Sequence, residues 1–366
     1  MIASICVLVA CPALAAGGEG SLAPGLGLTD WIEPGAAGGL AGNGSYEPGR
    51  PGERAGALGA DERSRIGAYH GVPLVVHTFA FDDATSTGAL LPLMRDLVSA
   101  NVDRGIGVVG VAHAAGDDAP ALLKQHEVPY PVARADLAKA NGAYLDLATN
   151  GLVHAWVIDP NGALLWHGEP VDDERAFLAA VQAAYARTLV APLEHALDAE
   201  LEKATVAYLA GELKDARARA NKLASAKDEA LAADAAALVG LVDATRDGWM
   251  ADARSRGAAG PDLRYFEVVR AIRTALARTD AVKELDELEQ DVRKHQLWRL
   301  RAQDLETWLD LRVERPALFP ARVDGAGDAF AKQLESFGRS TFNSNEGTRA
   351  AKELLERYAQ ARARAD

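Results

Sequence analysis

The side chains best placed to do chemistry follow an apolar stretch at residues 71–81. Four of them carry a carboxyl or hydroxyl group: Asp83, Thr85, Ser86 and Thr87. A hydroxyl becomes a nucleophile when an adjacent base activates it, and the sequence places no base beside these residues. Asp, Ser and Thr are also preferred N-cap residues. We therefore interpret the group as the cap of a helix.

Four histidines are the other reactive candidates, and they lie in or next to apolar runs: His77, His113, His154 and His167. If the runs that carry His77 and His154 pair as strands, these two rings approach each other. A zinc site needs at least a third protein ligand, and no His-Glu-x-x-His motif is present. The sequence therefore predicts partly buried, hydrogen-bonded histidines and no metal site.

Residues 105–110 read Gly-Ile-Gly-Val-Val-Gly, which is the glycine spacing of a dinucleotide-binding loop. In such a loop the glycines connect a strand to the start of a helix. Here they lie inside an apolar, β-branched run, so we interpret them as part of a closely packed strand. No cofactor is predicted.

The hydrophobic pattern predicts the elements that hold these candidates. The apolar run that ends at Phe81 and the run at residues 105–112 are typical of buried strands, and residues 87–101 between them predict a helix. A strand, helix and strand at this spacing indicate two parallel strands. Further along, the pattern predicts helices near residues 118–126, 136–144 and 173–189, and a β-hairpin at residues 152–167 around the turn Asp159-Pro160-Asn161-Gly162.

This arrangement resembles the thioredoxin-like redoxins of bacterial envelopes, over residues 56–187. In that family the first strand leads into Cys-x-x-Cys, and a helix-kinking proline follows five residues after the second cysteine. With Pro92 as that proline, Ala84 and Thr87 occupy the two cysteine positions. The cis-proline with which the family opens its hairpin corresponds to Val153.

The resemblance implies an α/β thioredoxin-like domain, a mixed sheet flanked by helices, with a degenerate active site. Asp159 matches an acidic residue that the family carries at its hairpin turn. Thiol–disulfide exchange and thiol-based peroxide reduction both begin at a cysteine thiolate, which neither Ala84 nor Thr87 supplies. A cis peptide before a non-proline residue costs about 3 kcal/mol relative to trans, so Val153 is not expected to replace the proline that holds the family's substrate chain. We therefore expect no catalytic residue here.

Both cysteines of the chain, Cys6 and Cys11, lie in the apolar run at residues 1–16. This run is too short to span a bilayer and ends in small residues, so we interpret it as a signal segment. Two cleavage sites stay open: Ala13-Leu14-Ala15 suits an ordinary signal peptidase, and Leu8-Val9-Ala10-Cys11 resembles a lipobox that makes Cys11 a lipid attachment site. No Lys or Arg precedes Arg50, which leaves open a true start upstream of Met1. A buried apolar helix is the remaining alternative.

Residues 17–55 are rich in Gly, Ala and Pro, so we predict a flexible tether. Within it, residues 28–32 are apolar enough to dock on the folded domain. We assign residues 56–189 to the thioredoxin-like domain and residues 190–366 to a second domain, and we expect residues 56–187 to fold without that second domain.

The second domain consists of long periodic runs of Ala, Leu, Glu, Lys and Arg, broken near residues 257–261 and 315–316. This pattern predicts an all-α helical domain. The spacing of Tyr208, Gly211 and Ala216 is similar to that of a tetratricopeptide-type helical repeat. An irregular bundle is the alternative, because no period of about 34 residues recurs.

The chain carries 39 Lys and Arg against 52 Asp and Glu, a net charge of −13. This argues against nucleic acid or anionic lipid as a main partner, because both attract clustered cations. We expect an exported, redox-inactive protein of the bacterial cell envelope or periplasm that binds a partner protein through its helical domain, with a membrane tether at the N-terminus as an option. The sequence identifies no small-molecule substrate. The alternative function is a thiol–disulfide oxidoreductase or peroxidase-like redoxin.

Overall fold

The computed structural model describes residues 23, 26, 28, 30–32, 69–135, 151–193, 197–294, 296–340 and 346–365. The predicted signal segment with Cys11, most of the predicted tether and the predicted helix at residues 136–144 lie outside the described residues. Within the described ranges, no helix is long and apolar enough to cross a membrane.

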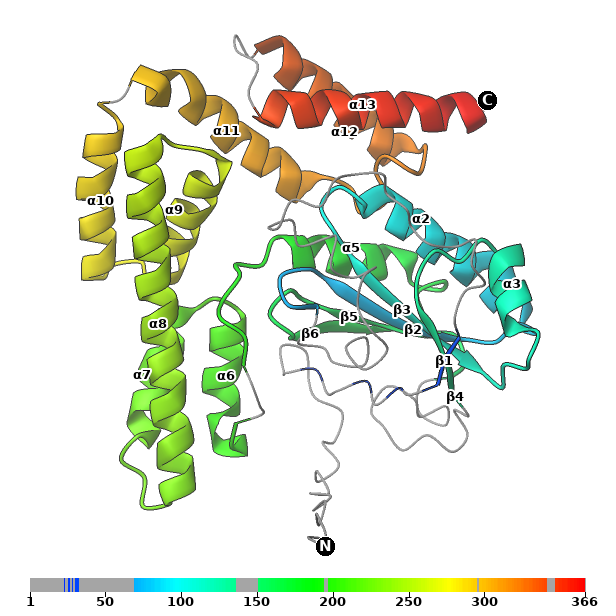
Figure 1. Cartoon of the computed structure of the whole chain (residues 1–366), viewed down its shortest axis with the longest axis horizontal. Coiled ribbons are helices and arrows are strands. Elements are labelled where there is room, and N and C mark those ends of the chain that lie inside the picture. The colour runs from blue at the N-terminus through cyan, green and yellow to red at the C-terminus, as the bar shows by residue number, and fades with distance from the viewer. Residues whose placement is uncertain are drawn as a thin grey trace, which may run out of the picture.

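Six strands of the described chain form one mixed sheet in the order β1-β4-β3-β2-β5-β6 (Figure 1). Three neighbouring strands are parallel: β2 (Leu74–Phe79), β3 (Gly107–His113) and β4 (Val132–Ala135). On one side, β5 (His154–Ile158) runs antiparallel to β2 and pairs with β6 (Leu164–Gly168). At the other edge, β1 (Trp31–Ile32) runs antiparallel to β4. The predicted parallel pair and hairpin are both confirmed.

Helices cover one face of this sheet: α2 (Leu91–Asn101), α3 (Ala119–Gln125) and α5 (Glu174–Tyr185). Because side chains alternate along a strand, Val75 and Phe79 of β2 point into this layer and Val76 points to the other face. Val75 and Phe79 share a buried cluster with Met94 of α2 and Phe177 of α5. The apolar side chains of β2 and of the helices therefore form the core on this side.

The opposite face is covered by chain from the predicted tether. Ala23, Leu26 and Leu28 are buried and share a cluster with Val76 and Trp156 of the sheet. The expected docking of residues 28–32 is therefore present, and it extends to Ala23. Most of residues 17–55 lie outside the described residues, so the tether itself stays a prediction.

The rest of the described chain is helical, as predicted, with buried apolar side chains between the helices. Its helices range from 8 to 31 residues in length, so the repeat stays a prediction. The described helices are α6 (Glu202–Leu209), α7 (Leu213–Leu223), α8 (Glu229–Ala259), α9 (Leu263–Ala275), α10 (Asp280–Val292), α11 (Gln296–Glu314), α12 (Gly325–Ser340) and α13 (Glu346–Ala365). Helices α8 and α11 end at the two predicted breaks, the first at Gly260, whose φ of 112° suits glycine.

At two places, residues of one domain pack in the hydrophobic core of the other. Ala163 at the hairpin turn is 2% exposed and belongs to the core cluster of the helical domain. Ala317 and Leu318, between α11 and α12, are each 4% exposed and belong to the core cluster of the sheet and its helices. Each domain therefore buries part of the other, which the division of the sequence at residue 190 did not anticipate.

Candidate functional site

The carboxylate and hydroxyl side chains after β2 form hydrogen bonds at the start of a helix. Asp83 Oδ2 accepts a hydrogen bond from the Ser86 amide at 2.5 Å, and the Thr87 hydroxyl donates to the Asp83 carbonyl at 3.0 Å. The buried Ser86 hydroxyl accepts from the amide of Ala80 at 3.2 Å. Each of these contacts is to backbone, and together they fix the turn from strand to helix. The arrangement matches helix capping and offers no activated nucleophile.

Pro92 lies at the first turn of α2, directly after a π-helical turn, η3 (Ser86–Leu90). Proline has no N–H to donate and its ring crowds the preceding turn, and a π-turn is one way in which a helix adapts to such a defect. The helix irregularity expected at Pro92 is therefore present. Ala84 and Thr87 lie in the distorted helix start before it.

Val153 lies opposite this turn, immediately before β5. The Thr78 hydroxyl of β2 donates to the carbonyl of Leu152 at 2.7 Å, which holds the segment against the sheet. Within the described chain the cis peptide bond is Phe319–Pro320, so the bond before Val153 is trans. Valine therefore does not reproduce the backbone geometry of a cis-proline, as expected for a non-proline residue.

The fold brings the two halves of the expected site together around a surface pocket of about 270 Å³. Thr85 contributes from the helix start, next to Ala84, and Val153 contributes from the opposite wall. The pocket lining is completed by Leu152, Glu169, Val171 and Asp172. The pocket thus offers a hydroxyl, two carboxylates and apolar surface, and no sulfur.

The histidines do not form the pair considered from sequence. Strand register pairs His77 with Ala155 and Thr78 with His154, so the two histidines point to opposite faces of the sheet. His154 instead meets His167 of β6, with Nε2 of the first and Nδ1 of the second 3.4 Å apart. No group of three His, Cys, Asp or Glu side chains in the described part of the chain is arranged to hold a metal ion.

His77 also departs from the hydrogen-bonded state expected for it. Its ring is fully buried, and neither nitrogen has a hydrogen-bond partner among the described residues. It packs against the rings of Phe79 and Tyr130, with centroids 5.4 and 5.3 Å away. Burial lowers the pKa of His77 to about 3, so the ring is neutral at physiological pH. Gly110 of β3 leaves room for the ring, since an added Cβ there would come within 3.2 Å of Nε2.

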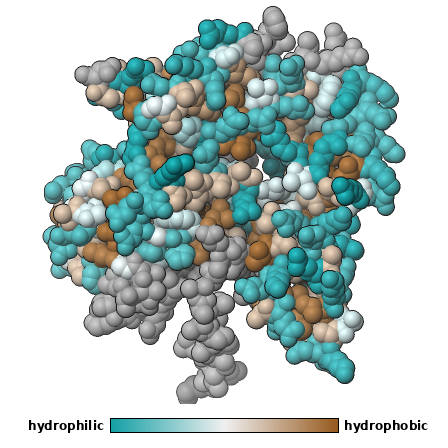
Figure 2. Space-filling view, turned by 180° about the vertical axis from the view of Figure 1, so that it is seen from behind, coloured by the Kyte–Doolittle hydropathy of each residue, from teal (hydrophilic) through white to brown (hydrophobic). Residues whose placement is uncertain are grey.

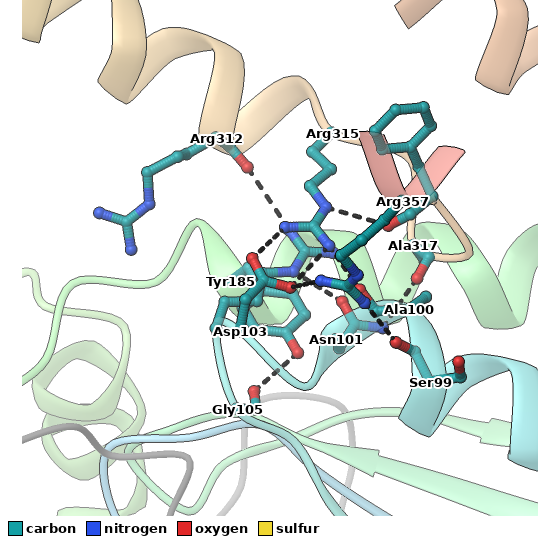
Figure 3. A network of polar contacts seen from close by, with 12 residues as sticks. Ser99, Ala100, Asn101, Asp103, Gly105, Tyr185, Arg312, Arg315, Ala317 and Arg357 are labelled. Carbon is teal, nitrogen blue, oxygen red and sulfur yellow. Dashed lines mark hydrogen bonds and ion pairs between the residues drawn. The ribbon is translucent and has the colours of Figure 1, made fainter. Parts of the chain in front are cut away.

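A second polar cluster, which sequence reasoning missed, joins the domains at the end of α2 (Figure 3). The Arg315 guanidinium donates to both oxygens of Asp103, at 2.6 and 3.0 Å, and also to the carbonyls of Phe319 and Ala100. Arg357 of α13 donates to Asp103 Oδ1 at 3.0 Å. Asp103 thereby holds two arginines of the helical domain.

Neighbouring groups complete this cluster. Asn101 donates to the carbonyl of Ala317 at 2.8 Å, and the guanidinium of Arg104 lies 3.7 Å from the ring centroid of Tyr185. Burial raises the pKa of Asp103, but the hydrogen bonds and charges of Arg315 and Arg357 outweigh it and bring the pKa to about 2. The cluster has no signal in the sequence, because Asp103 and Arg315 are 212 positions apart.

The sheet defines the class of fold. Three parallel strands, flanked by an antiparallel hairpin on the β2 side and covered by a helix that starts directly after β2, form a thioredoxin-like α/β domain, here joined to a helical domain. No protein-family model and no curated protein matches the chain.

Solved structures similar to this chain are thioredoxin-like or thiol–disulfide proteins. A thioredoxin-like superfamily protein has 19% identity, covers 45% of this chain and 96% of its own, and gives a TM-score of 0.31. A thiol:disulfide interchange protein of the thioredoxin family from Chlorobium tepidum has 21% identity, with 31% and 80% coverage and a TM-score of 0.25. A thiol-disulfide isomerase from Corynebacterium glutamicum has 14% identity, with 43% and 94% coverage and a TM-score of 0.29.

Proposed function

We propose that this chain is an exported thioredoxin-like protein that has no thiol chemistry and acts by binding a partner protein. One observation carries the proposal: the pocket where the redox site is expected is lined by Thr85 and Val153, and the neighbouring cysteine positions are Ala84 and Thr87. A thiolate is required both for thiol–disulfide exchange and for thiol-based peroxide reduction. The chain's two cysteines are far from this pocket in sequence, at positions 6 and 11.

The helical domain is the proposed binding surface. Helices α6 to α8 form an arm that projects away from the sheet in Figure 1, and hydrophilic residues cover most of the same arm in Figure 2. Helix α7 exposes Lys214, Arg219 and Lys222, and no ion pair engages these cations within the described chain. They are therefore available to a partner, and packed helices of this kind present a surface that needs no catalytic residue.

Export is part of the proposal and rests on the apolar segment at residues 1–16, with Cys11 as the lipid attachment site. Metabolic labelling with a lipid analogue tests the attachment. We expect label on the wild-type chain and none on Cys11→Ser. Equal labelling of both chains, or of neither, removes Cys11 from this role.

The absence of thiol chemistry is tested with the full-length chain in insulin-disulfide reduction and hydroperoxide consumption. We expect no turnover in either assay. The double variant Ala84→Cys, Thr87→Cys is the positive control, because it restores the two thiols at the start of the helix. Clear turnover by the wild-type chain would establish the alternative, a redoxin of the cell envelope that acts without the usual cysteines.

The binding surface is tested by crosslinking in intact cells and recovery of the partner with the full-length chain. We expect Lys214→Glu, Lys222→Glu to lose the partner that the wild type recovers. The matched control, Val153→Tyr, fills the pocket and should keep recovery. If the pocket variant loses the partner and the α7 variant keeps it, the binding surface lies in the pocket.

A further inference from the structure

A buried carboxylate lies where the hairpin turn of the sheet enters the helical domain. Asp159 is 2% exposed, and its Oδ1 accepts hydrogen bonds from the amides of Asn161 and Ala163, both at 2.9 Å. Ala163 packs in the core of the helical domain. Asp159 therefore sets the shape of the turn at the point where the turn attaches to the other domain.

Asn161 attaches the hairpin turn to the helical domain through its side chain. Its side-chain amide donates to the carbonyls of Thr188 and Leu209, at 2.7 and 2.8 Å, and its Oδ1 accepts from the amide of Val190 at 2.9 Å. Leu209 ends α6, the first α-helix of the helical domain. One side chain thus ties the turn to the connecting segment and to α6, and its position depends on the turn that Asp159 organises.

The second carboxylate oxygen of Asp159, Oδ2, has weaker polar contacts than Oδ1. Oδ2 is buried and receives no hydrogen bond from the described residues. It forms an ion pair with Arg187 Nε at 3.6 Å, on a side chain that is one-third exposed. Helix α6 contributes a backbone carbonyl at this joint, and the turn before β2 contributes His70, whose Nε2 lies 2.9 Å from the Val190 carbonyl. Burial lowers the pKa of His70, against the opposing effect of that hydrogen bond.

These contacts leave the ionised form of Asp159 incompletely compensated. Burial raises the pKa of Asp159 to about 6, although hydrogen bonds from backbone amides and the charge of Arg187 act in the opposite direction. At the other attachment, Arg315 and Arg357 keep Asp103 ionised. Between about pH 5 and 7, therefore, Asp159 changes charge and Asp103 does not.

We propose that the Asp159–Asn161 attachment is a pH-responsive joint between the two domains. The closed form of the joint becomes more stable when Asp159 takes up a proton and less stable when Asp159 ionises. The Asp103–Arg315 attachment does not change over the same pH range. The reason is linkage: opening the joint returns Asp159 to water, where its carboxylate is solvated, so ionisation favours the open form and protonation favours the closed form. If the Asp159–Asn161 attachment opens and the Asp103–Arg315 attachment does not, the helical arm can move about the Asp103–Arg315 attachment.

Amide hydrogen exchange on the full-length chain tests the joint. After correction for the intrinsic pH dependence of exchange, we expect the protection factors of the Asn161, Ala163 and Val190 amides to rise by about tenfold between pH 7.5 and 5.0. The amide of Gly105, which donates to the Asn101 carbonyl at 2.8 Å near the fixed attachment, is the internal control and should not share this rise. Absence of a rise at the joint overturns the proposal.

Three variants test whether Asp159 is the group that takes up the proton. Asp159→Asn keeps an acceptor but cannot ionise, so its protection should be independent of pH; a response equal to that of the wild type overturns the proposal. Arg187→Gln retains Asp159 and removes the favourable charge, so the midpoint should move to higher pH, and an unmoved midpoint also counts against the proposal. Because burial lowers the pKa of His70, a proton on His70 opposes closure, so His70→Gln should keep the rise in protection; loss of the rise in this variant overturns the role of Asp159.

Discussion

Arg315 donates two hydrogen bonds, of 2.6 and 3.0 Å, to the carboxylate of Asp103. Arg315 lies in the segment after α11, and Asp103 lies in the segment after α2. The side chain of Arg315 is 4% exposed, and two further donors reach the backbone carbonyls of Phe319 and Ala100. A buried guanidinium that makes four hydrogen bonds is costly to remove, because the buried carbonyls that accept from it are left without a donor. This contact is therefore a principal link between the two domains.

We predict that Arg315→Ala lowers the free energy of unfolding by about 3 kcal/mol, since it leaves the carbonyls of Phe319 and Ala100 without their buried donor and removes one of the two arginines that hold Asp103. Urea denaturation of the full-length chain measures the change. The control is Arg362→Ala, which breaks an exposed bridge to Asp328 of 3.0 Å and should cost at most about 0.5 kcal/mol. Equal effects of the two substitutions would contradict the assigned role of Arg315.

His77→Leu should stabilise the protein by about 1–2 kcal/mol at pH 7, because it removes buried ring nitrogens that lack hydrogen-bond partners among the described residues. The pKa of His77 is lowered to about 3, so below the usual value of 6.5 the unfolded chain binds a proton that the folded chain does not. The wild type therefore loses stability as pH falls from 6.5 towards 3. The gain from the substitution should grow between pH 7 and 4.5.

Denaturation midpoints at the two pH values measure this prediction. His126→Leu, at the half-buried end of α3, is the control for replacing a histidine with leucine. An unchanged or smaller gain at pH 4.5 would show that the buried ring is compensated.

Two glycines of α8 should respond to alanine in opposite ways. At Gly257 a Cβ would come within 2.8 Å of Val292 Cγ2 on α10, so Gly257→Ala should cost about 1–3 kcal/mol through overpacking. At Gly248, apart from the adjacent residues and the backbone of α8 itself, no atom of the described chain lies within 4 Å of the added carbon, so Gly248→Ala should stabilise the helix by about 0.5–1 kcal/mol. Thermal unfolding of the two variants compares them directly, and a shift of the same sign in both would refute this account of α8 packing.

Removing residues 190–366 should destabilise the thioredoxin-like domain, contrary to the expectation from sequence that it folds alone. The deletion takes away Ala317 and Leu318, which complete the core above α2. The far-ultraviolet circular dichroism and thermal midpoint of residues 1–189 measure the effect against the full-length chain. Leu318→Ala in the intact chain should cost about 3 kcal/mol for the same reason. A truncated domain with an unchanged midpoint would show that the two cores are independent.

The sequence was most informative where the structure depends on neighbouring residues. Runs of β-branched residues predicted β2 and β3, and Asp159-Pro160-Asn161-Gly162 predicted the turn in which Gly162 has a φ of 87°. The placement of Thr85 near Val153 followed from the same local elements, because the ends of β2 and β5 are adjacent once the strands pair. These features depend on backbone preference and on hydrophobic periodicity, which are local properties.

Register was the first feature that the sequence left undecided. His77 and His154 lie on adjacent strands, as expected, yet a shift of one residue in pairing decides whether two side chains share a face. The observed pairing of His77 with Ala155 places the histidines on opposite faces. The burial of His77 also depends on the space above Gly110 of a different strand.

The joints between the domains were decided by the tertiary structure alone. Asp103 and Arg315 are 212 positions apart, and Asn161 and Leu209 are 48 apart, so no local preference links either pair. Their charges and amides find each other only after both cores have formed and excluded water, because a polar group that loses its hydration must then be paired within the protein. The sequence determined the two kinds of domain, and the packing of one domain into the other determined which polar residues hold them together.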